Sequence, residues 1–169
     1  GGSGSELAPH GDLLDLGAIG LADDDALIPL PLLERGLLLG EMGSAPMLVA
    51  PRDPALQGDG MVREGVETLR AGWSPDPETS ETLPLRQLLA LHQRHPERQL
   101  RLMNLSTAAA VESLRTDPLP PLASVCWWHL LADRGNLLEG DASWRVRPSL
   151  GGASDPVSYT HLRAHETSG

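Results

Sequence analysis

The sequence has little sulfur and few aromatic rings. Its 169 residues include one cysteine, one tyrosine, four tryptophans and no phenylalanine. Because Cys126 is the single cysteine, no disulfide can form within the chain, which fits a reducing compartment such as the cytoplasm. Leucine therefore supplies most of the apolar side chains of the expected core.

Positive charge and long apolar runs are also scarce. The formal net charge is -10 and no basic patch stands out, which argues against nucleic acid or an anionic membrane as a partner. No apolar run reaches membrane-spanning length and no signal peptide is recognisable, so we expect a cytoplasmic protein without a membrane partner. No glycine-rich phosphate loop follows an expected strand, which leaves a nucleotide-binding fold without support.

The two ends of the sequence look like additions to a natural segment. Residues 1–5, GGSGS, have the composition of a linker and are set aside. The range 156–169 contains VSYTHLRAHET, which matches an in-frame translation of a transposase-type sequencing adapter. We expect adapter read-through followed by linker there, with a genuine basic and aromatic tail as the alternative. The range 6–155 is long enough for one domain with a buried core.

The most informative stretch is 99–114, QLRLMNLSTAAAVESL. Its apolar run over 100–105 has the length of a buried strand, and hydroxyl residues that favour helix N-caps follow directly. Asn104 and Ser106 would then lie at the carboxyl end of that strand. Ligands bind at this end of the strands in α/β folds, so we expect any site to be there.

The rest of the chain alternates in the same way. Further strands are predicted over 18–22, 47–50 and 122–130. In the last of these, Trp127 and Trp128 should point to opposite faces. Strands that alternate with helices favour parallel βα units, and a complete TIM barrel needs about 250 residues. We therefore predict an α/β fold that is a partial TIM (β/α)₈ barrel of about four consecutive βα units.

Two connecting segments carry weaker expectations. Leucines at helical spacing predict an amphipathic helix over 80–92, with Ser80 as its N-cap. Glu81 is assigned only a role near the helix cap. The range 51–65 is rich in glycine, proline and aspartate, which predicts a loop.

Seven short motifs follow one another along the chain: LADDD, PMLVAPRDPAL, GDGMVREG, SET before a helix, RLMNLSTAAAVESLR, SVCWWHLLAD and RVRPSLGGASD. Their order and spacing over 13–155 resemble the middle portion of dihydroorotase. That family consists of metal-dependent cyclic amidohydrolases of pyrimidine biosynthesis with a TIM-barrel fold of the metal-dependent hydrolase type. The resemblance implies a reaction that interconverts N-carbamoyl-L-aspartate and dihydroorotate at a zinc centre.

The resemblance also implies where the family's site residues fall. The metal-bridging aspartate matches Asp24. The ligand histidine of a His-x-Glu-Asp pattern matches Ala50, and the ligand histidine of a His-Val-Ser-Thr pattern matches Asn104. The substrate-contacting asparagine of an Asn-Pro-Pro-Leu-Arg pattern matches Arg147. In the family a His-x-His pair precedes the matched segment, and a catalytic aspartate follows it.

These replacements predict a vestigial site. Ala50 has no donor atom, and the neutral amide of Asn104 is a poor zinc ligand beside imidazole. We expect no zinc, no other cofactor and no catalysis, but a structural role. The resemblance implies aspartate transcarbamoylase as a partner, and open barrel edges suggest self-association as another mode. Two alternatives stay open, namely an active amidohydrolase whose metal is held by Asp24, Asp53 and His129, and an unrelated α/β binding module.

Overall fold

A parallel sheet of four strands forms the centre of the computed structural model, which describes residues 6–23, 26–138 and 142–155. The strands lie side by side in the order β1 (Leu21–Ala22), β2 (Met47–Val49), β5 (Leu100–Leu105) and β6 (Leu122–Val125). The register pairs Ala22 with Leu48 and Val49 with Leu102. Parallel pairing of successive strands confirms the predicted fold. The segments 1–5 and 156–169, interpreted above as linker and adapter read-through, lie outside the described residues.

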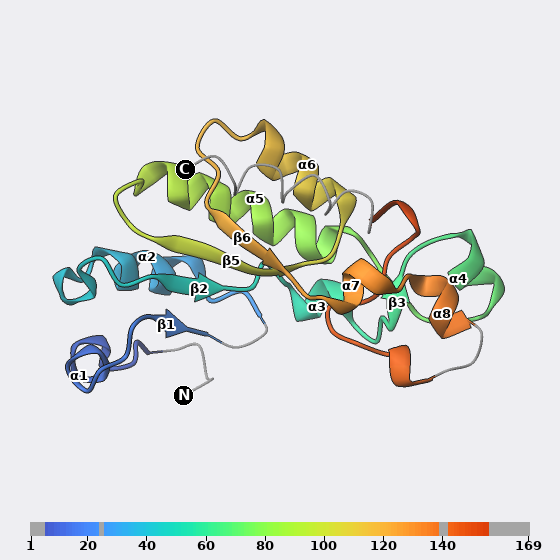
Figure 1. Cartoon of the computed structure of the whole chain (residues 1–169), viewed down its shortest axis with the longest axis horizontal. Helices are drawn as coiled ribbons and strands as arrows, with labels where there is room; N and C mark the ends of the chain where they lie inside the picture. The colour runs from blue at the N-terminus through green and yellow to red at the C-terminus, as the bar shows by residue number, and fades with distance from the viewer. Residues whose placement is uncertain (1–5, 24–25, 139–141, 156–169) are drawn as a thin grey trace.

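Helices connect these strands and cover the sheet. In Figure 1, α5 and α6 lie together against the strands, while α1 and α2 lie near β1 at one end of the molecule. The helical elements are α1 (His10–Asp15), α2 (Leu30–Leu38), η1 (Gly40–Met42), α3 (Pro54–Gln57), α4 (Val66–Arg70), α5 (Thr79–Arg94), α6 (Ala108–Thr116), α7 (Trp128–Leu131), α8 (Arg134–Leu138) and η2 (Ala142–Trp144).

The β5–α6 unit forms where the sequence predicts it. Leu100 and Leu102 are buried and Arg101 between them is exposed, which is the period of a strand with one covered face. Thr107 then caps α6, because its Oγ1 accepts a hydrogen bond from the amide of Ala110 at 3.1 Å.

The main core lies between the sheet and helices α2, α5 and α6. Its buried members are Leu33, Leu37, Met42, Met47, Val49, Leu85, Leu88, Leu89, Leu91, Leu100, Leu102, Leu105, Ala110 and Leu114. Each fully buried leucine stabilises the fold by about 1.5–3 kcal/mol relative to an exposed one. This layer therefore holds β2 and β5 in place and fixes the positions of their carboxyl ends.

A second, smaller sheet occupies the segment predicted as loop. There β3 (Val62–Arg63) pairs in parallel with β4 (Pro75–Asp76). The loop prediction over 51–65 is therefore wrong in part, since that range contains both α3 and β3. Two-residue strands are too short to show a period in the sequence.

The strand predicted over 122–130 is also wrong beyond its first half. β6 ends at Val125, and a short helical turn follows, in which the amide of His129 donates to the carbonyl of Cys126 at 3.0 Å. Trp127 and Trp128 do not point to opposite faces of a strand, since their rings lie 3.5 Å apart between centroids. A continuous apolar run of this length does not distinguish a buried strand from a strand followed by a helix.

The strands at the two sides of the sheet are β1 and β6. β1 is shorter than predicted and begins at Leu21, while Ile19 before it is 93% exposed. Large apolar side chains are exposed near β6 as well, namely Leu119, Leu122, Trp127, Trp128 and Leu131. Across the described ranges, no helix has both the length and the apolar character needed to cross a bilayer.

Candidate functional site

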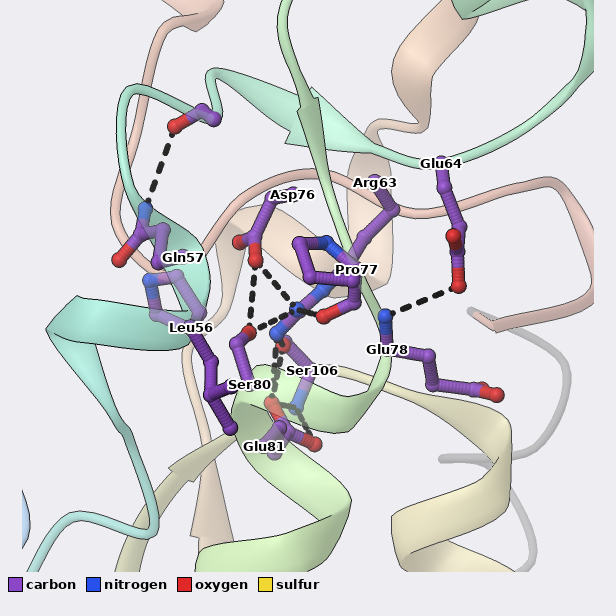
Figure 2. Close-up of polar contacts among 12 residues, drawn as sticks. Leu56, Gln57, Arg63, Glu64, Asp76, Pro77, Glu78, Ser80, Glu81 and Ser106 are labelled. Carbon is purple, nitrogen blue, oxygen red and sulfur yellow. Dashed lines mark hydrogen bonds and ion pairs between the residues drawn. The ribbon is translucent and has the colours of Figure 1, made fainter.

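A buried arginine joins four segments near the carboxyl ends of the strands (Figure 2). Arg63, at the end of β3, is only 4% exposed. Its Nη1 lies 3.1 Å from Asp76 Oδ1 of β4 and donates to Ser80 Oγ of α5 at 2.8 Å. Its Nη2 donates to Glu81 Oε2 at 3.0 Å and to Ser106 Oγ at 2.8 Å. The guanidinium group thus cross-links β3, β4, the start of α5 and the end of β5.

Glu81 is the second centre of this cluster, and it is 2% exposed. Its carboxylate accepts from the backbone amides of Ser106 and Thr107, each at 3.0 Å from Oε1. The hydroxyls of the same two residues also donate to it. Its expected role as a cap residue is therefore wrong, because the carboxylate reaches across to the β5–α6 turn.

Hydrogen bonding makes this burial of charge tolerable. One guanidinium faces two carboxylates, and the excess negative charge is met by the two backbone amides and by hydroxyl donors. Ser80 Oγ in turn donates to Asp76 Oδ1 at 2.6 Å. The cluster is buried, and all of its polar side-chain atoms except Arg63 Nε have hydrogen-bond partners. Its role is therefore to hold these segments in fixed positions.

Arg63 and Asp76 were not predicted from the sequence, and the prediction of Ser80 as a helix N-cap is wrong, because α5 begins at Thr79 and Glu78 occupies the N-cap position. The available signal was Arg63 in GDGMVREG, a charged residue that directly follows the apolar pair Met61-Val62 in a segment expected to be loop. Long-range partners such as Arg63 and Ser106, which are 43 residues apart, cannot be paired without the sheet order. Only the capping role of the Ser106–Thr107 junction was accessible from local pattern.

The two positions matched to ligand histidines lie at adjacent strand ends. Ala50 directly follows β2 and is buried, and Asn104 lies near the end of β5. Both come after the Val49–Leu102 pair in the parallel register, so they share the carboxyl edge of the sheet. Asn104 has φ of 55°, at an irregularity of the β5–β6 pairing. Asp24, matched to the bridging aspartate, lies outside the described residues.

The other predicted positions have different roles: Asp53 and His129 bond to backbone groups, and Arg147 is exposed. Asp53 caps α3, since its Oδ1 accepts from the amides of Ala55 and Leu56 at 2.8 and 3.3 Å. The ring of His129 is buried and its Nε2 lies 3.1 Å from the carbonyl oxygen of Pro148. Burial lowers the pKa of His129. Arg147 is exposed and precedes a cis peptide bond to Pro148.

The donor set at this edge does not fit zinc. Ala50 offers no ligand atom, and the amide oxygen of Asn104 is a weak donor for this ion. Because a carbonyl only accepts, His129 Nε2 carries the proton it donates to Pro148, which leaves only Nδ1 for any other partner. In the part of the chain that the structure describes, no three His, Cys, Asp or Glu side chains group as a metal site.

Comparison with known proteins identifies relatives by sequence. No family model matches the chain. A probable dihydroorotase-like protein of Synechocystis sp. is 32% identical over 169 aligned residues, which cover 94% of this chain and 38% of the relative. The dihydroorotase of Anaeromyxobacter dehalogenans is 30% identical over 161 residues, covering 92% of this chain and 37% of the relative. The chain thus spans less than two fifths of these relatives' length.

Solved structures show the same fold. A dihydroorotase from Campylobacter jejuni superposes with a TM-score of 0.62 over 89% of this chain and 41% of its own, at 14% identity. The L-hydantoinase (dihydropyrimidinase) of Arthrobacter aurescens gives a TM-score of 0.64 over 88% of this chain and 36% of its own, also at 14% identity.

The fold is therefore part of a TIM barrel of the amidohydrolase type. By sequence, the chain is similar to a dihydroorotase-like protein and to dihydroorotases. The alternative of an unrelated α/β binding module is wrong, since sequence and fold both match the same group of proteins over about nine tenths of the chain.

Proposed function

We propose that this chain is part of a dihydroorotase-like protein of the pyrimidine-biosynthesis amidohydrolase family that has lost catalysis and keeps the barrel for a structural role. One observation carries the proposal. Ala50 and Asn104, at neighbouring strand ends, stand where the resemblance implies ligand histidines. Hydrolysis or closure of a cyclic amide needs a Lewis acid and an activated water, which a site without those imidazoles supports poorly.

The active alternative would have to rebuild two local structures. The Asp53 carboxylate would have to release the α3 amides that it caps. His129 could bind the metal only through Nδ1, and its ring is buried. Loss of the Asp53 cap costs free energy because the amides of Ala55 and Leu56 lose their partner, and the bare Nδ1 of His129 can reach a metal ion only if the buried ring is uncovered. The existing hydrogen bonds of Asp53 and the burial of His129 support the proposal that the site is inactive.

A structural role needs a surface for contact. The outer strands β1 and β6 have unfilled pairing edges among the described residues, and exposed apolar side chains lie beside both. We propose that such a protein works in the cytoplasm and contacts aspartate transcarbamoylase, or a second copy of itself, through these edges.

Turnover of dihydroorotate by the chain with added Zn²⁺ tests the loss of catalysis. A dihydroorotase from one of the relatives serves as the positive control, and we expect no turnover above buffer from this chain. Turnover that requires Zn²⁺ and disappears in the Asp53→Asn or His129→Gln variant would overturn the proposal and establish the active alternative.

A further inference from the structure

The main sheet has half the strands of a complete TIM barrel, and its helices cover one face. Its four strands run parallel and lie side by side in the order in which they follow along the chain, whereas a TIM barrel has eight. Helices α2, α5 and α6 contribute Leu33, Leu88 and Leu114 to a core on one face (Figure 1). The helices of a barrel lie outside its strands, so the opposite face of this sheet corresponds to a barrel interior.

This inner face is largely uncovered. One row of register partners crosses the whole sheet through Ala22, Leu48, Arg101 and Leu122. Because side chains alternate along a strand, their neighbours, such as Leu21, point to the other face and pack against the core. Ala22, Arg101 and Leu122 are exposed, and Leu48 is half-buried.

Both edges of the sheet also present apolar side chains. Leu16 and Ile19, which lead into β1, are 86% and 93% exposed. At the other edge, Leu122 of β6 and Trp127 just after it are 61% and 53% exposed. Among the described strands, β1 and β6 each have one neighbour, so each has a free pairing edge. A partner that carries one edge of each kind would cover both.

Charge selects which edges can meet. The range 6–23, which leads into and includes β1, carries four acidic residues and no lysine or arginine. The range 118–131, which includes β6, has no Asp, Glu, Lys or Arg, and the register neighbour of Leu122 is the cation Arg101. Two β1 edges would bring like charges together, whereas a β6 edge can meet a β1 edge without that repulsion.

We propose that two copies of this chain close one eight-stranded parallel barrel, in which β6 of each copy pairs with β1 of the other. A two-fold axis along the barrel keeps all strands parallel, and the head-to-tail contact closes after two copies. Pairing of β6 with β6 about a two-fold axis would be antiparallel and would leave both β1 edges open. The inference rests on the part of the proposed function that assigns contact to the sheet edges, and it names a second copy as the occupant.

The side chains of the inner face are compatible with closure. Arg101 is the second residue of β5, and its Nη2 donates to Oε1 of Gln99, just before the strand, at 3.4 Å. The guanidinium group therefore lies toward the amino end of the strand, where a barrel opens to water. Leu48 and Leu122 are left to fill the interior layer, as branched side chains do in TIM barrels.

Sedimentation equilibrium of the full chain tests the number of copies, and cysteine crosslinking tests which strands meet. We expect a species of twice the chain mass of 18.0 kDa. The native chain has one thiol, Cys126, directly after β6, and Ala22→Cys adds a second one in β1. Within one chain these strands are three strand spacings apart, about 14 Å. A thiol crosslinker too short for that distance should therefore convert most of this variant into a covalent dimer.

Three further variants are the controls for this contact. Addition of Cys126→Ser to Ala22→Cys should abolish the covalent dimer, because β1 of one copy does not meet β1 of the other. Leu56→Cys places the new thiol on α3 and should give no dimer. Leu122→Cys reports antiparallel pairing of two β6 strands, which would bring position 122 close to Cys126 of the other copy, and should give none either.

Four results would overturn the proposal. They are a monomer at every concentration, a dimer that Ala22→Cys does not crosslink, a ladder of larger covalent products, which indicates open-ended contacts, and efficient crosslinking of the Leu122→Cys variant. Turnover of dihydroorotate is measured separately. An inactive monomer would therefore refute this inference alone, and a catalytically active dimer would refute the loss of catalysis alone.

Discussion

At the scale of single residues, Arg63 carries the largest energetic consequence. Its guanidinium touches two carboxylates and two hydroxyls, and all of these groups are buried. A buried ion pair is weak evidence for net stability, because desolvation offsets the attraction. Removal of one partner is different, since it leaves the opposite charge buried without compensation.

Replacing Arg63 with Met should therefore lower the free energy of unfolding by about 3–5 kcal/mol, measured by urea denaturation. The matched control is Arg115→Met, which removes an exposed arginine paired with Glu112 and should change stability little. Equal, small effects of both substitutions would show that the Arg63 cluster does not hold these segments together.

Two buried histidines predict acid sensitivity. Burial lowers the pKa of both His92 and His129 from the usual value of 6.5. The unfolded chain therefore takes up protons as the pH falls through 6.5, while the folded chain resists until a lower pH. The contribution of these two neutral histidines to the free energy of unfolding is fully present above this pH range and is lost progressively as the pH falls through it.

We expect the urea concentration at the unfolding midpoint to decrease when the pH is lowered from 7.5 to 5. The His129→Gln variant should show a smaller decrease. The glutamine amide can still donate to the Pro148 carbonyl but has no charge to gain. His92 keeps its own contribution, so part of the pH dependence should persist. A variant with the same pH dependence as the native chain would contradict the assignment to His129.

At the scale of elements, the β5–α6 junction shows how the sheet and the buried cluster depend on each other. Thr107 Oγ1 accepts from the Ala110 amide and donates to Glu81 Oε1 at 2.9 Å. The N-cap of α6 is thereby tied to the start of α5. A change at this one hydroxyl therefore affects two helices.

Thr107→Val should lower the free energy of unfolding by about 1–2 kcal/mol, because the cap of α6 and a bond to a buried carboxylate are both lost. Thr116→Val, at the other end of α6, removes an exposed hydroxyl that bonds only within its own helix. Comparable losses in the two variants, measured by thermal or urea unfolding, would argue against a special role for the cap.

The elements differ in how far the sequence predicts them. β5 and α6 follow from an apolar run, hydroxyl caps and helical spacing, all of which are local. The sheet of β3 and β4 and the turn at Trp127 depend on distant partners, such as the Pro148 carbonyl that receives a bond from His129. For the site, the resemblance indicated Ala50 and Asn104, whereas the Arg63 cluster needed the three-dimensional arrangement of four separate segments.

At the scale of the whole molecule, the open sheet is the dominant feature. A closed barrel has no edges, but here β1 and β6 are the outer strands of the described sheet. Exposed apolar side chains accompany both edges, including Ile19 beside β1 and Leu122 within β6. Such edges favour contact with another chain.

We expect the chain to self-associate as its concentration rises through the micromolar range, as measured by sedimentation velocity. A lysine at a strand edge opposes pairing, so Leu122→Lys should shift the distribution toward monomer. Leu56→Lys places the same charge at an exposed apolar residue of helix α3, which is not an edge strand, and should have little effect. A monodisperse, cooperatively unfolding native monomer would contradict the prediction.

We expect that Ala50 and Asn104, at two adjacent strand ends, cannot hold a metal ion. Calorimetric titration with Zn²⁺ of the native chain and of an Ala50→His, Asn104→His double variant tests it most directly. Histidine tolerates the positive φ at position 104 better than most residues, so the comparison is structurally fair. We expect no stoichiometric zinc binding by the native chain and a clear gain of affinity in the variant. Stoichiometric binding by the native chain, or no gain in the variant, would contradict it.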